Sequence, residues 1–421
     1  MTISVKTSHI SRRALLKGGA LTVGFAIAGL PLAASAQAGR VLDNKEVDAF
    51  LAVNGDGTVT LYSGKVDLGQ GLRIALPQIA AEELGIGIDK IKHIEGDTAL
   101  TPDQGRTSGS NGIQRGGMQI RQAAATARKA LIELAAQRLN AKPDDLATDN
   151  GMVRPKSGGA GVTFADLIGG RQFDLKLDPK AALKDPATYT LVGKPLPRPD
   201  VPEKCLGKHV YVHDFSVPNM LHARVIRPPA LGATLVSVDD SSIKDFAGAR
   251  TVRVKDMLAV VADDEWTAVR AARALKAQWS NGSGLPVQAE LAASLRADPN
   301  LTDETLVNKG TPTAQSPDGA KTLKASYFWP MQSHGSIGPS CAVADVTADA
   351  ATIWTASQGT HGNQKTVARF LGLPDALRDR LLATHPEYAV LATRDGELAP
   401  LRNDPHYAAR FAELVTAPRK P

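Results

Sequence analysis

Two stretches of glycine and small polar residues have the composition of phosphate-binding loops. The first covers residues 64–71 (GKVDLGQG) and the second covers residues 103–112 (DQGRTSGSNG). Each stands before a helical pattern. A loop without large side chains lets main-chain N–H groups approach a ligand, and the N-terminus of the next helix adds unpaired donors and a positive dipole end. Two such loops favour a large phosphate-bearing cofactor; a pair of ordinary loop-to-helix turns is the alternative.

The elements that must hold these loops follow from hydrophobic spacing. Residues 50–63 predict a hairpin, and residues 91–96 predict a short strand. Helical spacing predicts one helix that ends near Leu84 and a second, alanine-rich helix over residues 118–139. Residues 162–167 indicate a strand that enters a short helix. Each glycine-rich loop therefore lies between a predicted strand and a predicted helix.

The later part of the chain predicts a separate α+β unit. Proline and lysine are frequent between residues 169 and 206, which favours an extended linker, although a long surface loop within one domain is the alternative. Further on, Asp264 is expected to cap a helix whose apolar face includes Trp266 and Trp279. Strands are expected at residues 210–215, 220–227, 233–238, 251–254, 258–262, 323–329, 341–346 and 352–356, and a last helix over residues 365–371.

Composition narrows the classes of function. The net charge of +6 is scattered over 421 residues without a basic stripe that contains aromatic residues, so nucleic-acid binding is disfavoured. Cys205 and Cys341 are the two cysteines, and they are too few for a zinc site of the usual spacing or for a cysteine-ligated iron–sulfur cluster. They form either a disulfide or two free, buried thiols.

The N-terminus has the order of an export signal. A twin-arginine pattern at residues 11–17 (SRRALLK) precedes an apolar run over residues 18–32 and the small residues Ala34, Ser35 and Ala36. We therefore expect a periplasmic protein that is exported by the twin-arginine route and has no stable membrane span after cleavage. An uncleaved membrane anchor is the alternative, although the apolar run is short for one.

Four stretches together resemble the molybdopterin-binding large subunits of the xanthine dehydrogenase and aldehyde oxidase family. The resemblance is to the exported, isoquinoline 1-oxidoreductase-like branch in particular, and it runs from about Leu51 to Pro374. The stretches are residues 64–71 with 80–84, residues 103–125, residues 220–229 with 232–233, and residues 353–358. The implied fold class is α+β, with a partial molybdopterin-binding domain, an a/b hammerhead-like domain and an unrelated helical C-terminal tail.

The resemblance and the signal together divide the chain. We expect a signal peptide (1–36), a partial molybdopterin-binding domain (37–168), a linker (169–206), an a/b hammerhead-like domain (207–280), a surface excursion (281–320), the start of a second molybdopterin-binding region (321–374) and a helical tail outside the family pattern (375–421).

The resemblance implies a molybdenum hydroxylase that hydroxylates an N-heterocycle or an aldehyde at an electron-poor carbon, with water as the oxygen source. Its cofactor would be molybdenum–molybdopterin, with the cytosine dinucleotide form as one option. The pterin dithiolene holds the metal, so no protein ligand to the metal is expected. Iron–sulfur clusters would lie only on a partner, a small two-iron ferredoxin-like subunit.

Matching positions suggest the site residues. Gln358 resembles the family's glutamine that donates to a metal-bound oxygen, and Gln70 resembles the glutamine that lies against the pterin. As alternatives, Gln358 is a solvent-exposed turn residue and Gln70 only caps its helix. Asp67 and Glu83 are expected as solvated carboxylates rather than an acid–base pair, and His334 as a packed histidine. The cofactor would also meet the backbone of Gly69, Gly71, Ser108, Gly109 and Ser110.

The resemblance stops after Pro374. The family continues through another glycine-rich loop and a region that bears the catalytic glutamate, whereas residues 375–421 here show amphipathic helical patterns. A frameshift, a gene fusion or a truncation would explain this, and loss of that general base alone would cost about 10²–10⁴-fold in rate. Whether the chain is an active enzyme is therefore open. The second hypothesis is a catalytically inactive remnant or a partner-binding exported protein.

Overall fold

The computed structural model describes residues 42–283, 285, 287–310, 321, 323–330, 332, 335–346 and 351–370. The chain divides into two compact units: the first ends at Ser216 and resumes at Ser340, and the second covers Val217–Pro339. The expected signal peptide (1–36), the expected tail (375–421) and His334 lie outside the described residues. Within the described ranges, no helix combines the length and apolar character that a membrane crossing requires.

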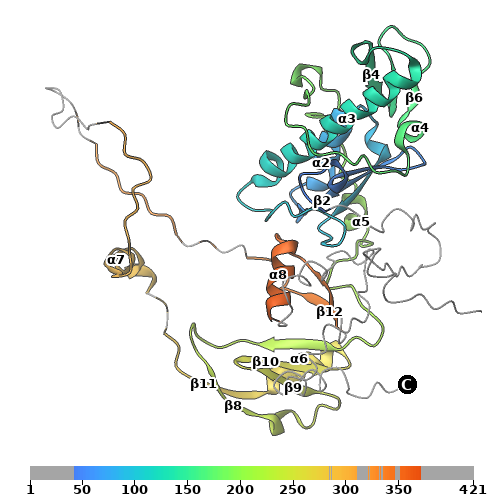
Figure 1. Cartoon of the computed structure of the whole chain (residues 1–421). Helices are drawn as coiled ribbons and strands as arrows, with labels where there is room; N and C mark the ends of the chain where they lie inside the picture. The colour runs from blue at the N-terminus through green and yellow to red at the C-terminus, as the bar shows by residue number, and fades with distance from the viewer. Residues whose placement is uncertain are drawn as a thin grey trace, which may run out of the picture. The chain divides into compact units, whose positions relative to one another are not determined.

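The first unit is built on a three-stranded sheet with two long helices, which confirms the elements predicted around the loops (Figure 1). The sheet order is β1-β2-β3; β1 and β2 form the antiparallel hairpin, while β2 and β3 run parallel. A parallel pair needs a crossover, and α2 supplies it. The elements are β1 (Leu51–Val53), β2 (Val59–Ser63), α2 (Leu72–Leu84), β3 (Ile91–Glu95) and α3 (Met118–Leu139).

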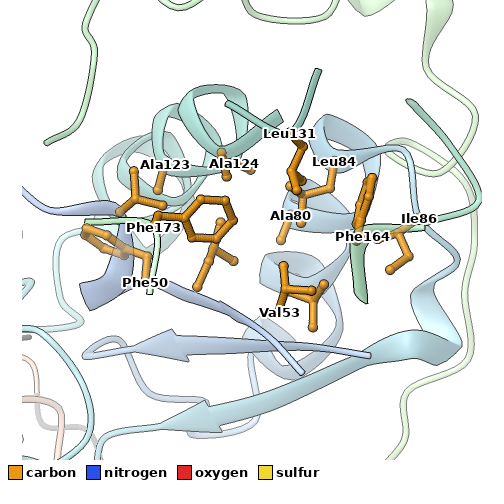
Figure 2. Close-up of a cluster of buried hydrophobic side chains, with 14 of the residues drawn as sticks. Phe50, Val53, Ala80, Leu84, Ile86, Ala123, Ala124, Leu131, Phe164 and Phe173 are labelled. Carbon is orange, nitrogen blue, oxygen red and sulfur yellow. The ribbon is translucent and has the colours of Figure 1, made fainter. Parts of the chain in front are cut away.

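The core of this unit lies between the sheet and the two helices (Figure 2). Phe50 and Phe164 are fully buried there, and Leu131 of α3 meets the apolar face of α2. Alanines such as Ala123 and Ala124 let α3 pack closely. Burial of large apolar side chains contributes roughly 1.5–3 kcal/mol each, so this packing fixes the starts of both helices.

One element was not predicted: residues Gly112–Gly117 form a π-helix directly before α3. Its glycines permit close approach to neighbouring side chains. A Cβ on Gly116 would lie 2.6 Å from Cγ of Lys65, and one on Gly117 would lie 2.9 Å from Cδ1 of Ile79. Only glycine allows the second loop to enter α3 against these side chains.

The chain beyond α3 returns to the same unit. A small sheet of order β4-β5-β6 leads into α4, as the pattern at residues 162–167 predicted. The segment expected as a linker (169–206) then binds two buried glutamates at the end of α2. Glu82 accepts the N–H groups of residues 190–192 at 2.6–3.1 Å. The elements are β4 (Leu146–Asp149), β5 (Met152–Pro155), β6 (Val162–Thr163), α4 (Phe164–Ile168), η5 (Pro186–Thr188) and α5 (Val201–Cys205).

The expectation that Glu83 is a solvated carboxylate was wrong. Its side chain is 1% exposed and forms ion pairs with Arg121 at 2.8 Å and Arg128 at 3.0 Å. It also accepts the N–H of Lys184 at 3.1 Å. A buried carboxylate requires such partners, and sequence spacing did not show that residues 100 positions away would supply one of them.

The second unit is the expected small α+β domain. Its strands form a β7-β10-β9 sheet and a β11-β8 pair, and Asp264 caps α6 through a 2.9 Å bond from the N–H of Thr267. The helix ends at Ala274, so placing Trp279 on its face was wrong; that residue pairs with Leu235 in a sheet. The elements are β7 (His222–Ile226), β8 (Leu235–Asp239), η6 (Asp240–Ile243), β9 (Arg250–Val254), β10 (Met257–Ala262), α6 (Glu265–Ala274), β11 (Lys276–Trp279), η7 (Gln288–Glu290) and α7 (Leu291–Ala297).

The chain re-enters the first unit through a hairpin and a helix. β12 (Ala342–Val346) pairs antiparallel with β13 (Ala351–Thr355), as expected, and α8 covers Thr360–Phe370. The strands expected at residues 210–215 and 323–329 were wrong, because neither stretch pairs with another strand among the described residues. High β-propensity does not form a strand without a neighbour that takes up its hydrogen bonds.

Candidate cofactor-binding site

The structure brings the two glycine-rich loops together. We call residues 64–71 loop 1 and residues 103–112 loop 2. The N–H of Val66 donates to the Thr107 hydroxyl at 3.1 Å, and the N–H of Gly64 donates to Oε1 of Gln104 at 3.0 Å. A Cβ on Gly64 would lie 2.1 Å from the main-chain oxygen of Pro102, so glycine is required for this approach. The two loops therefore form one surface at the starts of α2 and α3.

Lys65 fastens loop 2 from below. Its side chain is fully buried, and its Nζ donates to the carbonyls of Gly105 at 3.3 Å and Arg106 at 2.7 Å and to Oδ1 of Asn111 at 3.1 Å. Burial lowers the pKa of Lys65, and the nearby Arg115 lowers it further. The sequence analysis did not assign this residue. A lysine inside a loop of small residues was the available signal.

In loop 1 the anion at the start of α2 is the chain's own Asp67. Its carboxylate accepts the N–H groups of Gly69 at 2.7 Å, Gly71 at 3.2 Å and Arg73 at 2.9 Å. Burial alone would raise the pKa of Asp67, but these three donors outweigh it and hold the pKa below its usual value. Asp67 is thus not the solvated carboxylate that we expected, and it occupies the N–H donors predicted to meet a cofactor.

Gln70 is also engaged within loop 1. Its Oε1 accepts the N–H of Leu68 at 2.6 Å, and its Nε2 donates to the carbonyl of Val66 at 2.9 Å. Arg198 donates to the carbonyl of Gly69 at 2.6 Å from outside the loop. The capping role considered for Gln70 falls to Asp67, and contact of Gln70 with a pterin stays a prediction.

Loop 2, by contrast, presents open donors. Among the described residues, the N–H groups of Ser108, Gly109 and Ser110 have no protein acceptor. All three residues are exposed, with φ of +57° at Gly109 and +58° at Ser110. A left-handed Ser110 is a strained conformation of the kind that recurs at ligand sites. Consecutive exposed N–H groups of this kind form an anion-binding concavity.

Gln358 lies beside loop 2. Its carbonyl accepts the N–H of Thr107 at 2.7 Å, and its side chain is exposed. Next to it is a cavity of about 150 Å³, lined by Gly64, Asp103, Gly105 and Arg106 on one side and by residues 359–362 at the start of α8 on the other. Thr360 in that wall is 2% exposed, and its hydroxyl has no partner among the described residues.

Asp103 joins loop 2 to α8. Its carboxylate pairs with Lys365 at 2.9 Å and accepts the N–H of Gly105 at 2.9 Å. Burial works to raise the pKa of Asp103, but Lys365 and the Gly105 N–H outweigh it, so the pKa lies below its usual value. The carboxylate is therefore ionised near neutral pH and serves to hold the cavity together.

The arrangement fits a phosphate-bearing group at loop 2. Open N–H donors, the Arg106 side chain and the buried Lys65 ammonium place positive potential there, while the glycine at position 109 leaves open space where a Cβ would stand. At loop 1, a cofactor could not use the N–H groups of Gly69 and Gly71 without displacing Asp67.

Comparison with known proteins bears on which group this is. Residues 7–198, which include both loops, match the family described as "Molybdopterin cofactor-binding domain". A nicotinate dehydrogenase polypeptide of Pseudomonas putida, one subunit of that enzyme, is 40% identical over 342 residues, 79% of this chain and 29% of the relative. The beta subunit of isoquinoline 1-oxidoreductase from Brevundimonas diminuta is 29% identical over 318 residues, 64% of this chain and 40% of the relative.

The chain belongs to the molybdopterin-binding xanthine dehydrogenase family. It spans 29% and 40% of the lengths of these two relatives. A solved quinoline 2-oxidoreductase from Pseudomonas putida 86 matches 28% of this chain and 15% of its own, at 27% identity and a TM-score of 0.26. The assignment to the xanthine dehydrogenase family rests on the sequence matches and not on that structural likeness.

The site of this xanthine dehydrogenase-family chain thus combines predicted and unpredicted residues. Of the predicted set, Ser108, Gly109, Ser110 and Gln358 lie together, whereas Gly69, Gln70 and Gly71 bond within loop 1. Lys65, Thr107 and Gln104, which join the loops, were missed because their partners are about 40 residues away in sequence.

Proposed function

We propose that this chain is the cofactor-binding part of a molybdenum hydroxylase that acts on an N-heterocycle. The observation that carries the proposal is the set of open N–H donors at residues 108–110 beside Gln358, in a chain of a molybdopterin-binding family. Two relatives are named for nicotinate and isoquinoline, both N-heterocycles, which supports this substrate class over an aldehyde.

Each part of the site has a defined task. The N–H groups of Ser108, Gly109 and Ser110 would bind a phosphate of the cofactor, which we propose to be the cytosine dinucleotide form of molybdenum–molybdopterin. When bound, this cofactor supplies oxidation of an electron-poor carbon with an oxygen atom that comes from water. Gln358, fixed through its own carbonyl, would donate its side-chain amide toward the cofactor and orient it.

We further propose a partner and a location. Two cysteines in 421 residues cannot bind an iron–sulfur cluster by four thiolates, so electrons would leave through a small two-iron ferredoxin-like subunit. That relatives are named as subunits supports a multi-subunit complex. The twin-arginine pattern at Arg12 and Arg13 supports export to the periplasm.

The test is the source of the oxygen atom. The full chain is expressed with its genomic neighbour that encodes a two-iron protein, and nicotinate, isoquinoline and a benzaldehyde are each supplied with an electron acceptor in ¹⁸O-labelled water. We expect a hydroxylated heterocycle that carries ¹⁸O. Oxidation of the aldehyde alone would move the substrate class, and no oxidation together with no bound molybdenum would support the alternative of an inactive, partner-binding protein.

A further inference from the structure

Lys65 is buried without a counter-ion. Its side chain is 0% exposed, and its three acceptors (two carbonyls and one side-chain amide) are all neutral. Among the described residues it forms no ion pair with a carboxylate; the nearby Asp103 is paired with Lys365. Burying an ammonium costs free energy unless its hydrogen bonds do something that a neutral residue would not.

The strongest of these bonds leads directly to Gln358. Lys65 Nζ donates to the Arg106 carbonyl at 2.7 Å, and the N–H of the same peptide unit, that of Thr107, donates to the Gln358 carbonyl at 2.7 Å. In a trans peptide the C=O and N–H point in opposite directions, and no cis peptide occurs among the described residues. A cation on the C=O side therefore orients the N–H and strengthens its hydrogen bond.

Two further contacts make this peptide a rigid link. The Thr107 hydroxyl accepts the N–H of Val66, the residue after Lys65, at 3.1 Å. The stem of Lys65 packs against Gly116, where a Cβ would lie 2.6 Å from Cγ of the lysine. Lys65 thus has one position available, and the Arg106–Thr107 peptide follows it.

We propose that Lys65 is a positioning residue that acts on Gln358 through the Arg106–Thr107 peptide. The inference rests on the proposed function for the role of Gln358, but the linkage itself belongs to the protein alone. Lys65 holds the peptide, the peptide holds the backbone of Gln358, and the side chain of Gln358 is thereby directed from a fixed point.

Hydrogen exchange tests the linkage without any substrate. In the full chain, Lys65→Met keeps the length of the stem but removes the ammonium. We expect amide exchange to rise about tenfold or more at Thr107, the factor that loss of a hydrogen bond to a charged group corresponds to, and to rise in residues 357–360 as well. Exchange in β2 and α3 should change little. Unchanged exchange at Thr107 in a folded Lys65→Met protein would overturn the proposal.

Matched glycine variants guard against a failure to fold. Gly116→Ala pushes on the Lys65 stem, whereas Gly117→Ala in the same π-helix meets Ile79. We expect faster exchange at Thr107 and at residues 357–360 in Gly116→Ala only. Equal effects of the two alanines would overturn the specific role of Lys65.

The effect on the cofactor separates positioning from plain stability. If Lys65 acts through Gln358, Lys65→Met and Gln358→Ala each lower molybdenum occupancy or kcat, but the double variant should resemble Gln358→Ala within about twofold. Effects that multiply would show that Lys65 acts elsewhere. If the wild-type chain holds no molybdenum, the proposed function fails, and hydrogen exchange alone decides the linkage.

Discussion

A single carboxylate makes the two glycine-rich loops different. Asp67 places its side chain on the N–H groups of Gly69, Gly71 and Arg73, so loop 1 already holds its anion. Loop 2 has Ser108 at the corresponding place, whose N–H stays open. The same backbone geometry therefore gives a closed turn in one case and a ligand site in the other.

Asp67 also predicts a pH dependence. Because the pKa of Asp67 is lowered in the folded protein, the stability that it contributes is present above the unfolded-state pKa of about 4 and is lost as pH falls through the lower folded-state value. Asp67→Asn should therefore reduce the free energy of unfolding at pH 7. The difference from wild type should shrink below about pH 4 in denaturant titrations. Equal stability of the two proteins at pH 7 would contradict the capping role.

Gly109 separates backbone strain from ligand contact. Gly109→Ala adds a methyl group at φ +57°, and Gly158→Ala adds one at φ +92° in an exposed turn; neither Cβ meets a protein atom within 4 Å. Each should cost about 1–2 kcal/mol of stability, but only Gly109→Ala should lower molybdenum occupancy. Equal occupancy in the two variants would place the cofactor away from loop 2.

At the scale of elements, two adjacent glutamates fasten residues 184–192 to α2. Glu82 accepts three successive N–H groups and Glu83 binds two arginines. Burial would raise the pKa of Glu82, but the backbone donors of Leu191, Val192 and Thr190 outweigh it and lower the pKa. These carboxylates are therefore structural, which distinguishes them from an acid–base pair.

Loss of this fastening should expose the segment. Glu82→Gln places an amide NH₂ against N–H donors and should cost roughly 1.5–3 kcal/mol. We expect faster trypsin cleavage at Lys184 and Lys194 at neutral pH, with Glu133→Gln on the exposed face of α3 as the control. Cleavage rates equal to those of the control would mean that packing alone holds the segment.

The helices and strands around the site could be predicted, but the links between them could not. The periodicity of Leu72, Leu76 and Leu84 encodes burial locally, so α2 was found with both its ends. The roles of Lys65 and Glu83 depend on partners 40 to 100 residues away, which spacing does not show. Trp279 was misplaced because pairing with β8 outweighed a helical pattern.

At the scale of the molecule, the site draws on distant parts of the sequence within one unit. Loop 1 and loop 2 precede residue 113, whereas Gln358 and α8 come after the second unit. The bond from Thr107 to Gln358 joins them across about 250 residues. Molybdopterin binding at this junction therefore depends on the return of the chain to the first unit.

The most direct test of the account is where the cofactor protects the backbone. The full chain is purified with and without cofactor loading, molybdenum and cytidine nucleotide are quantified, and amide exchange is compared between the two forms. We predict about one molybdenum per chain, with new protection at residues 108–110 and little change at Gly69 and Gly71. Protection confined to loop 1, or a loaded chain with unprotected residues 108–110, would contradict the account.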